Sequence, residues 1–327
     1  MFYNINRDCS NFNNINIGGG KMKKTAKILF LLLVFAIVLT GCEADISVPG
    51  EVGQDIITAD EALKVMEEEE VVVVDAQKSG DFEDQHLDGA VNIARNDITT
   101  FGPYPNMLAD ASKIESSLGD NGITNQSKVL IYDNNNNMDA ARLWWTMLVY
   151  GHSTDNMKVI SGGLNALEEA GATFTSGDYE VEALEYKAAE KNEDLIATKD
   201  EILAQVNNPS DDVAILDVRT ADEVSEGIIP GAIHINYVDN NKDNGEFYPP
   251  SYIQRYYPDN DITPDKEVIM YCQTSIRAAQ SYIALHNAGY RDLKLYDGAW
   301  IEWSSDSSTP KAMPTGAPAE PSAQDGS

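Results

Sequence analysis

The pattern of hydrophobic and polar positions occurs twice along the chain. Short apolar runs, typical of buried strands, alternate with longer stretches in which apolar residues recur at helical spacing. The runs at residues 71–74 and 129–132 have counterparts in the second half at 213–216 and 268–271. Alternating strands and helices predict a parallel sheet wrapped by helices. The chain is therefore expected to be an α/β protein with two tandem domains of one fold.

The most informative site candidate is the loop that follows the apolar run 268–271. Cys272 stands at the end of that predicted strand, and residues 278–285 have the pattern of a helix. Free backbone N–H groups and the helix dipole favour negative charge at such a position, which favours the thiolate over the thiol. Cys272 is therefore predicted to be the nucleophile of an enzyme. The alternative is a small buried side chain without a chemical role.

Short motifs recur in the same order along both copies. In the second copy they are 216–219, Glu223, 229–232, the Cys272 loop and 296–303. In the first copy they are 132–133, 141–145, 151–152 and 162–163. Together they resemble the two-domain rhodanese-like sulfurtransferases, which include thiosulfate and 3-mercaptopyruvate sulfurtransferases. The resemblance covers residues 56 to 303 and implies two tandem rhodanese-like domains, each a parallel sheet flanked by helices.

The resemblance implies a reaction in two displacements. The Cys272 thiolate attacks the outer sulfur of a small donor such as thiosulfate, and a thiol, cyanide or a protein dithiol then accepts the sulfur from the resulting persulfide. Backbone N–H groups, hydroxyls and a guanidinium of the loop would hold the anion, so the predicted binding residues are Gln273, Thr274, Ser275, Ile276 and Arg277. For Arg277 the alternative is a plain ion pair with an acid. Arg219, in the family's Asp-x-Arg motif, is also predicted to bind the anion, with an ion pair to Glu223 as the alternative.

The first copy is predicted to be non-catalytic. Asp133 occupies the position of the nucleophile, and its loop has one more residue before the Ala140-Ala141 pair. A carboxylate cannot form a persulfide, and a non-catalytic first domain is typical of the family. His86 and Arg95 are candidates to reach the cleft between the domains, although packing is the favoured interpretation of His86.

The sequence leaves the donor open. Positions 273–275 lack the further basic residues common in thiosulfate-type members, and residues 220–235 lack the second arginine of mercaptopyruvate-type members. Thiosulfate or a related sulfane donor is favoured, with 3-mercaptopyruvate as the alternative. A phosphatase or arsenate reductase would have one residue more between cysteine and arginine than the four found here. The remaining alternative is a surface lipoprotein that senses oxidants or binds a partner through its thiol.

Composition excludes several partner classes. The 327-residue chain carries 23 basic and 53 acidic residues, a formal net charge of −30, and so has no electrostatic footprint for nucleic acid or an anionic lipid surface. Its four histidines and three cysteines show no metal-ligand spacing. Neither a metal nor another cofactor is predicted.

The N-terminal residues have the pattern of a targeting segment. A basic cluster from Lys21 to Lys27 precedes the apolar run 28–39, which is too short to span a bilayer comfortably and fits a signal peptide. The sequence that ends this run, Leu39-Thr40-Gly41-Cys42, resembles the lipobox of bacterial lipoproteins, in which the peptide is cut before the cysteine and the sulfur carries a diacylglycerol. The protein is thus expected outside the cytoplasm, anchored to the cell membrane through lipidation of Cys42.

These observations predict a division of the chain into six parts. They are a signal peptide 1–41 with an alternative start at Met22, a lipidated tether 42–54, a non-catalytic domain 55–185, a linker 186–198, a catalytic domain 199–304 and a disordered tail 305–327.

Overall fold

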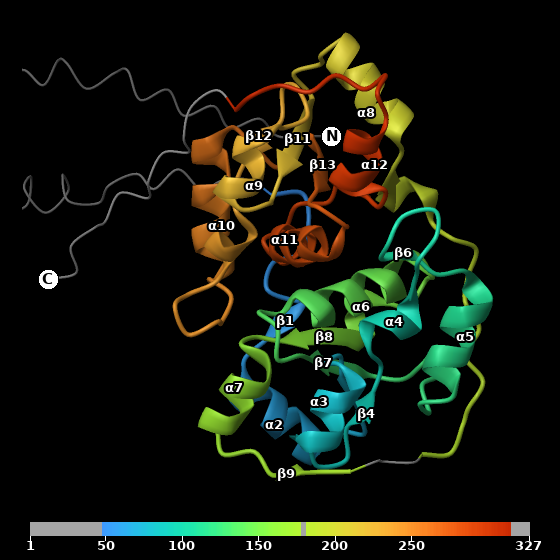
Figure 1. The fold of residues 1–327 in the computed structure, drawn as a ribbon. Helices are drawn as coiled ribbons and strands as arrows, with labels where there is room; N and C mark the ends of the chain where they lie inside the picture. Colours follow the sequence, from blue (N-terminus) through green and yellow to red (C-terminus); the bar gives the residue numbers. More distant parts are fainter. Residues whose placement is uncertain (1–47, 178–180, 315–327) are drawn as a thin grey trace, which may run out of the picture. The chain divides into compact units, whose positions relative to one another are not determined.

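The computed structural model describes residues 48–177 and 181–314 (Figure 1). The predicted signal peptide and Cys42 lie outside the described residues, as does the end of the predicted tail from residue 315. Within the described part of the chain, no helix is both long and apolar enough to cross a membrane.

The first domain is built on a five-stranded parallel sheet with the order β1-β8-β7-β2-β4. Its strands are β1 (Ile56–Ile57), β2 (Val72–Asp75), β4 (Val91–Asn92), β7 (Val129–Tyr132) and β8 (Met157–Ile160). Its helices are α2 (Ala59–Glu68), α3 (Ser79–Asp84), α4 (Arg95–Ile98), α5 (Ala111–Gly119), α6 (Met138–Val149), the single 3-10 turn η1 (Thr154–Asn156) and α7 (Gly163–Glu169). Two antiparallel pairs are separate from the sheet, β3 (His86–Leu87) with β9 (Phe174–Thr175) and β5 (Thr99–Thr100) with β6 (Met107–Leu108).

The second domain repeats this sheet with the order β10-β14-β13-β11-β12. Its strands are β10 (Ile196–Ala197), β11 (Val213–Asp217), β12 (Ile233–His234), β13 (Glu267–Tyr271) and β14 (Leu293–Tyr296). Its helices are η2 (Glu193–Leu195), α8 (Lys199–Asn207), α9 (Ala221–Ser225), η3 (Tyr237–Asn240), α10 (Pro250–Tyr256), η4 (Pro258–Asn260), α11 (Ile276–Asn287) and α12 (Ala299–Ser305). Both sheets are parallel and have the same strand order along the chain, which confirms the predicted repeat and fold class.

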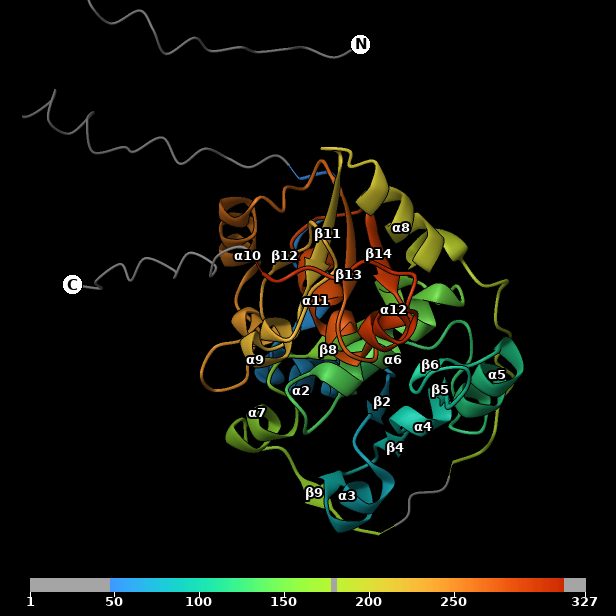
Figure 2. The ribbon, with the colours of Figure 1, turned by 45° about the horizontal axis from the view of Figure 1, so that its top comes forward.

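The helices α6 and α11 pack against each other and lie between the two sheets (Figure 2). Each begins after the loop that follows a central strand, β7 or β13. The side chains of both helices are buried on almost every side, as expected of a helix in the centre of a protein. The ring of Trp144 on α6 lies 6.4 Å from Tyr282 and 5.3 Å from His286 on α11, measured between ring centroids. The two predicted loops therefore begin the two helices that join the domains.

The ends of the domains differ from the predicted boundaries. Residues 48–54, expected to be part of a free tether, lie against the end of α11, where Gly50 and Gly53 donate backbone hydrogen bonds to the carbonyls of Gly289 and Asn287 at 2.9 and 2.8 Å. The predicted linker 186–198 already contains strand β10 of the second sheet. The tether was predicted from its glycines and the linker from its charged residues. Composition could not reveal these contacts, because the partner residues lie far away along the chain.

The prediction of a disordered tail from residue 305 is wrong for its first ten residues. Ala312 forms an antiparallel bridge with Ile228. The indole N–H of Trp303 donates to the carbonyl of Pro310 at 2.8 Å, and Thr309 is buried. A buried indole N–H requires an acceptor, and this segment supplies it.

Two equivalent buried aspartates have different environments in the two domains. Asp217 is paired with Arg219, whose Nη2 lies 2.6 Å from Oδ2. At the equivalent place in the first domain, Asp75 is followed by Gln77, which donates only its backbone N–H to Oδ1 at 2.9 Å and leaves Oδ2 buried without a partner. Burial raises the pKa of Asp75 to about 7, partly opposed by the nearby Tyr132 hydroxyl and by the Gln77 N–H.

Asp75→Asn is expected to stabilise the protein at pH 8 by on the order of 2–4 kcal/mol, because asparagine keeps the acceptor for Gln77 without a buried charge. The folded-state pKa exceeds the unfolded value, so the cost of Asp75 is absent below about pH 4 and grows as the pH rises to about 7. Urea unfolding at pH 4 and pH 8 measures the difference, which should be small at pH 4.

Whereas Asp75→Asn should raise the stability of the protein at pH 8, the matched variant Asp217→Asn should lower it. It leaves the Arg219 guanidinium buried without its anion and is expected to destabilise the fold by about 3–5 kcal/mol. Equal loss of stability in both variants at pH 8 would contradict this explanation.

Candidate active site

Strand β13 and helix α11 hold the Cys272 loop as the sequence predicted. Cys272 directly follows β13, is 1% exposed, and its carbonyl accepts a hydrogen bond from Trp300 N–H at 2.9 Å. The Gln273 carbonyl accepts from Ile301 N–H at 3.2 Å, so the start of α12 fixes the loop from one side. The loop ends at Ser275, whose φ of +65° turns the chain into α11. Ile276 is buried, so its backbone N–H is the group it offers to the site.

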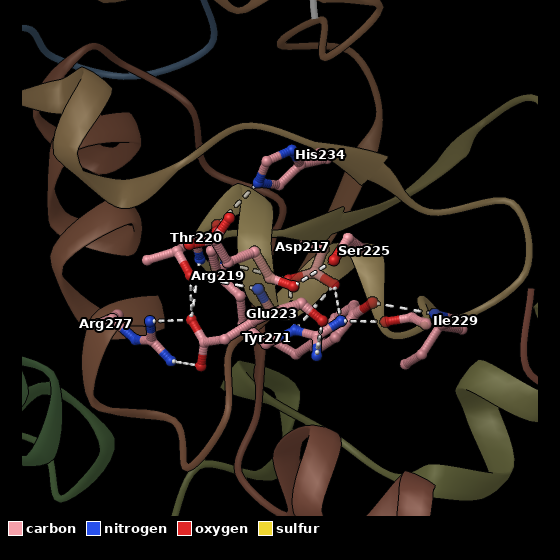
Figure 3. A network of polar contacts seen from close by, with 11 residues as sticks. Asp217, Arg219, Thr220, Glu223, Ser225, Ile229, His234, Tyr271 and Arg277 are labelled. Atoms are coloured by element: carbon pink, nitrogen blue, oxygen red, sulfur yellow. Dashed lines mark hydrogen bonds and ion pairs between the residues drawn. The ribbon is translucent and has the colours of Figure 1, made fainter. Parts of the chain in front are cut away.

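Arg277 makes a bidentate ion pair with Glu223 (Figure 3). Its Nη1 and Nη2 donate to the two carboxylate oxygens of Glu223 at 2.6 and 2.7 Å. Burial alone would lower the pKa of Arg277, but the hydrogen bonds and charge of Glu223, together with the neighbouring Cys272 side chain, raise it above its ordinary value. The arginine is thus a permanent cation beside the cysteine, and its fork is already occupied by an acid. Arg277 therefore makes an ion pair with an acid, and its role in binding the donor stays a prediction.

Arg219 does not lie at the loop as expected. It is 1% exposed, and its donors are directed to Asp217 and to the carbonyl of Gly227 at 2.7 Å (Figure 3). Its guanidinium lies 4.2 Å from the ring centroid of Trp300. The prediction that Arg219 binds the donor is therefore not met, and its acid is Asp217, because Glu223 is engaged by Arg277. Because Asp217 and Arg219 are only two residues apart, their side chains can pair with each other directly. The sequence motif did not show which acid would bind Arg219.

The hydroxyls of Thr274 and Ser275 are engaged by the first domain. Asn106 Nδ2 donates to Thr274 Oγ1 at 3.0 Å. Ser275 Oγ donates to Asp297 at 2.9 Å and accepts from Arg142 Nη1 at 3.0 Å. Ser275, which was predicted to help hold the anion through its hydroxyl, donates that hydroxyl to Asp297 instead.

Three residues of the site were not predicted from the sequence: Asn106, Arg142 and Asp297. One signal was present: Arg142 stands in the apolar stretch Ala-Ala-Arg-Leu-Trp-Trp, where a buried cation requires an anionic partner. The partner itself, 155 residues away along the chain, was not identifiable without the fold.

In the equivalent loop of the first domain, a carboxylate is bound by backbone N–H groups. The Asp133 carboxylate accepts four backbone hydrogen bonds of 2.8–3.0 Å from residues 135, 137, 139 and 140. Burial, followed by the charge of Asp139, raises the pKa of Asp133 to about 6 against the effect of these donors. The loop ends at Asn137 with φ of +63°, close to the value at Ser275. This loop, which is one residue longer than the Cys272 loop and has a second left-handed residue at Asn136, surrounds its anion with converging N–H groups.

The other first-domain candidates are engaged in local contacts. His86 hydrogen-bonds the Phe82 carbonyl through Nδ1 at 2.8 Å and stacks on the Phe82 ring. Arg95 pairs with Asp139 at 2.6 Å. Within residues 48–177 and 181–314, no group of three or more His, Cys, Asp or Glu side chains is arranged to hold a metal ion.

The comparisons with known proteins agree with this geometry. The profile of the Rhodanese-like domain family matches residues 58–170 and 198–306. The chain belongs to this family. It has two rhodanese-like domains and is a sulfurtransferase.

Relatives of this rhodanese-like protein span both domains. A Mycobacterium bovis protein named "Putative thiosulfate sulfurtransferase 1" is 28% identical over 269 residues, which cover 76% of this chain and 94% of that protein. A Haloferax volcanii protein with the same name, without the numeral, is 29% identical over 207 residues, which cover 58% of this chain and 71% of that protein. Among solved structures, the 3-mercaptopyruvate sulfurtransferase SseA from Escherichia coli has the same fold, with a TM-score of 0.68, 22% identity and coverage of 76% and 99% of the two chains.

The Glu223–Arg277 pair of this rhodanese-like domain gives a pH-dependent prediction. Hydrogen bonds from Arg277 lower the pKa of Glu223 to about 2 despite partial burial. The stabilisation is therefore complete above the unfolded pKa of about 4.3 and is lost as the pH falls toward 2. Because Glu223 is 32% exposed, solvent screening limits the contribution to about 1 kcal/mol.

Glu223→Gln should therefore lower the urea midpoint at pH 7 and leave it nearly unchanged near pH 2. Glu201, which is exposed and pairs with Lys294 in the same domain, is the control position, and Glu201→Gln should have a smaller effect. A loss of stability in Glu223→Gln that is the same at both pH values would contradict the assignment.

Proposed function

We propose that the protein transfers a sulfane sulfur from thiosulfate, or a related donor, to a thiophilic acceptor through a persulfide on Cys272. The observation that supports this most is the Asp133 carboxylate, held by four backbone N–H groups in the equivalent loop. Cys272 occupies the same place in the second domain, at the start of a loop that is one residue shorter and also ends in a left-handed residue, so a related set of N–H groups is available to a thiolate and then to a persulfide anion.

Each step of the proposed reaction moves one sulfur atom. The Cys272 thiolate attacks the outer sulfur of thiosulfate, the sulfur–sulfur bond of the donor breaks, and sulfite leaves with the electron pair. The acceptor thiolate or cyanide then attacks the outer sulfur of the persulfide, and the Cys272 thiolate leaves. No proton has to be transferred to the sulfur that leaves in either step, which agrees with a site that offers N–H groups and a cation in place of a general acid.

The donor preference rests on the named relatives and on the cation next to Cys272. The Mycobacterium and Haloferax relatives are named for thiosulfate, while the structural neighbour SseA acts on 3-mercaptopyruvate. Arg277 is the cation next to Cys272, but its fork is shared with Glu223. A donor that binds through its oxygens would therefore bind beside this ion pair or replace Glu223.

Intact-mass measurement tests the proposal. Residues 48–327, incubated with thiosulfate, should gain the mass of one sulfur atom, and the gain should be absent in Cys272→Ser. The same incubation with 3-mercaptopyruvate ranks the two donors, and Asp133→Asn should still take up sulfur because the first loop takes no part in the reaction. No mass gain with either donor would refute the sulfurtransferase reaction and leave the thiol-sensing alternative, in which peroxide oxidises Cys272.

We also propose that the protein is an extracytoplasmic lipoprotein attached through Cys42. The basic cluster, the apolar run 28–39 and Leu39-Thr40-Gly41-Cys42 support this. Expressed at full length in a bacterium, the wild type should sediment with membranes, and Cys42→Ser should appear uncleaved or in the soluble fraction. Equal distribution of both forms, with no change in processed mass, would contradict lipidation.

A further inference from the structure

The network around Arg142 joins the two domains at the catalytic loop. Arg142 lies on α6 of the first domain and has no exposed surface. Its Nη1 donates to Ser275 Oγ at 3.0 Å, and its Nη2 donates to Asp297 Oδ1 at 2.8 Å and to the Asn106 carbonyl at 3.0 Å. Asp297 also accepts hydrogen bonds from Ser275 Oγ at 2.9 Å and from Leu108 N–H at 2.7 Å.

Ser275 needs such support because its backbone is in an unfavourable conformation. Its φ of +65° lies in the left-handed region, which glycine and asparagine occupy readily and serine does not. The equivalent residue of the first domain is Asn137, with φ of +63°. The first loop thus has a residue that tolerates this conformation, whereas the catalytic loop has a serine whose hydroxyl is fixed by Arg142 and Asp297.

The direction of the Ser275 side chain also affects the N–H groups of the loop. A serine at the N-cap of a helix commonly accepts a hydrogen bond from a first-turn N–H group. Ser275 is the N-cap of α11 and makes no such bond, because its hydroxyl is turned to Asp297. The first-turn N–H groups therefore stay available to an anion on Cys272. In the first loop, the N–H groups of Asp139 and Ala140 at the start of α6 bind the Asp133 carboxylate.

We propose that Arg142 is a positioning residue for the reaction, which acts through Ser275: it holds Ser275 in the left-handed conformation and away from the helix N-terminus, so that the loop N–H groups converge on the Cys272 sulfur. This role rests on the proposed function of Cys272. It also assigns a task to the non-catalytic domain, which supplies Arg142 and, through Asn106, a second contact to the loop at Thr274.

The pair Ser275→Ala and Ser275→Gly tests the inference. Both remove the hydroxyl and leave the Arg142–Asp297 ion pair intact, but only glycine adopts φ of +65° without strain. The readout is the pH profile of Cys272 alkylation by iodoacetamide, which reports the thiolate and needs no sulfur donor. Ser275→Ala should shift the profile to higher pH and slow alkylation at pH 7 by about tenfold, and Ser275→Gly should remain within about threefold of wild type.

Variants of Arg142 complete the test. Arg142→Met with Asp297→Asn, which avoids an unpaired buried acid, should shift the profile as Ser275→Ala does, and adding Ser275→Gly should restore it. The matched control is Gln280→Met. Gln280 is the α11 counterpart of Arg142 and bonds Asn241, which contacts the Asp133 loop, so it should change stability without moving the Cys272 profile.

Several outcomes would overturn the inference. Equal shifts in Ser275→Ala and Ser275→Gly would mean that the hydroxyl itself acts on the sulfur. An unchanged profile in the Arg142 variant, or the same shift in Gln280→Met, would mean that Arg142 only joins the domains. Because the assay uses no donor, a wild type that takes up no sulfur would refute the proposed function and leave this comparison interpretable.

Discussion

The Arg142 side chain of the first domain has no exposed surface, and its guanidinium forms a buried ion pair with Asp297 of the second domain, with a nitrogen–oxygen distance of 2.8 Å. Removing two charges from water costs several kcal/mol for each ion, which is recovered only where the geometry is good and the remaining donors and acceptors are satisfied. Here Ser275, Asn106 and Leu108 supply most of those partners. The pair is therefore tied to one arrangement of the two domains, and the loop that carries Cys272 is part of that arrangement.

The two domains differ at the first residue of the equivalent loops, which is Asp133 in the first domain and Cys272 in the second. In the first loop the anion is built into the chain as Asp133, and the four N–H groups around it are permanently occupied. In the second loop the corresponding residue is Cys272, so a thiol side chain stands where the first loop has a carboxylate. The buried aspartates at the ends of β2 and β11 also differ. Asp217 is paired with Arg219, whereas Asp75 has no arginine partner. The first domain thus has a buried aspartate without an arginine partner beside its sheet, and a carboxylate held by backbone N–H groups in its loop.

The fold was predictable from the sequence because it rests on local patterns that occur twice. The short apolar runs, the Cys272 loop and its counterpart at Asp133 were all found from periodicity and spacing. The polar partners were not, because they are set by contacts across long distances in sequence. Arg277 and Arg219 illustrate this, since Glu223 is near Arg219 in sequence yet its carboxylate binds Arg277, 54 residues away. Ser275 likewise has the right chemistry to face the sulfur, and its backbone conformation and the Arg142 guanidinium turn it elsewhere.

The residues that precede the first domain contact the second. Gly50 and Gly53 bond to the end of α11, Glu51 accepts a hydrogen bond from Arg291, and Asp55 is buried beside His286. Asn287 then accepts from the N–H groups of Asp55 and Ile56, at the point where the chain enters strand β1. Along the sequence, the chain therefore contacts its second domain before it enters the first sheet. Any load applied through the N-terminal end would reach the far end of α11, the helix that begins after the Cys272 loop, without passing through the first sheet.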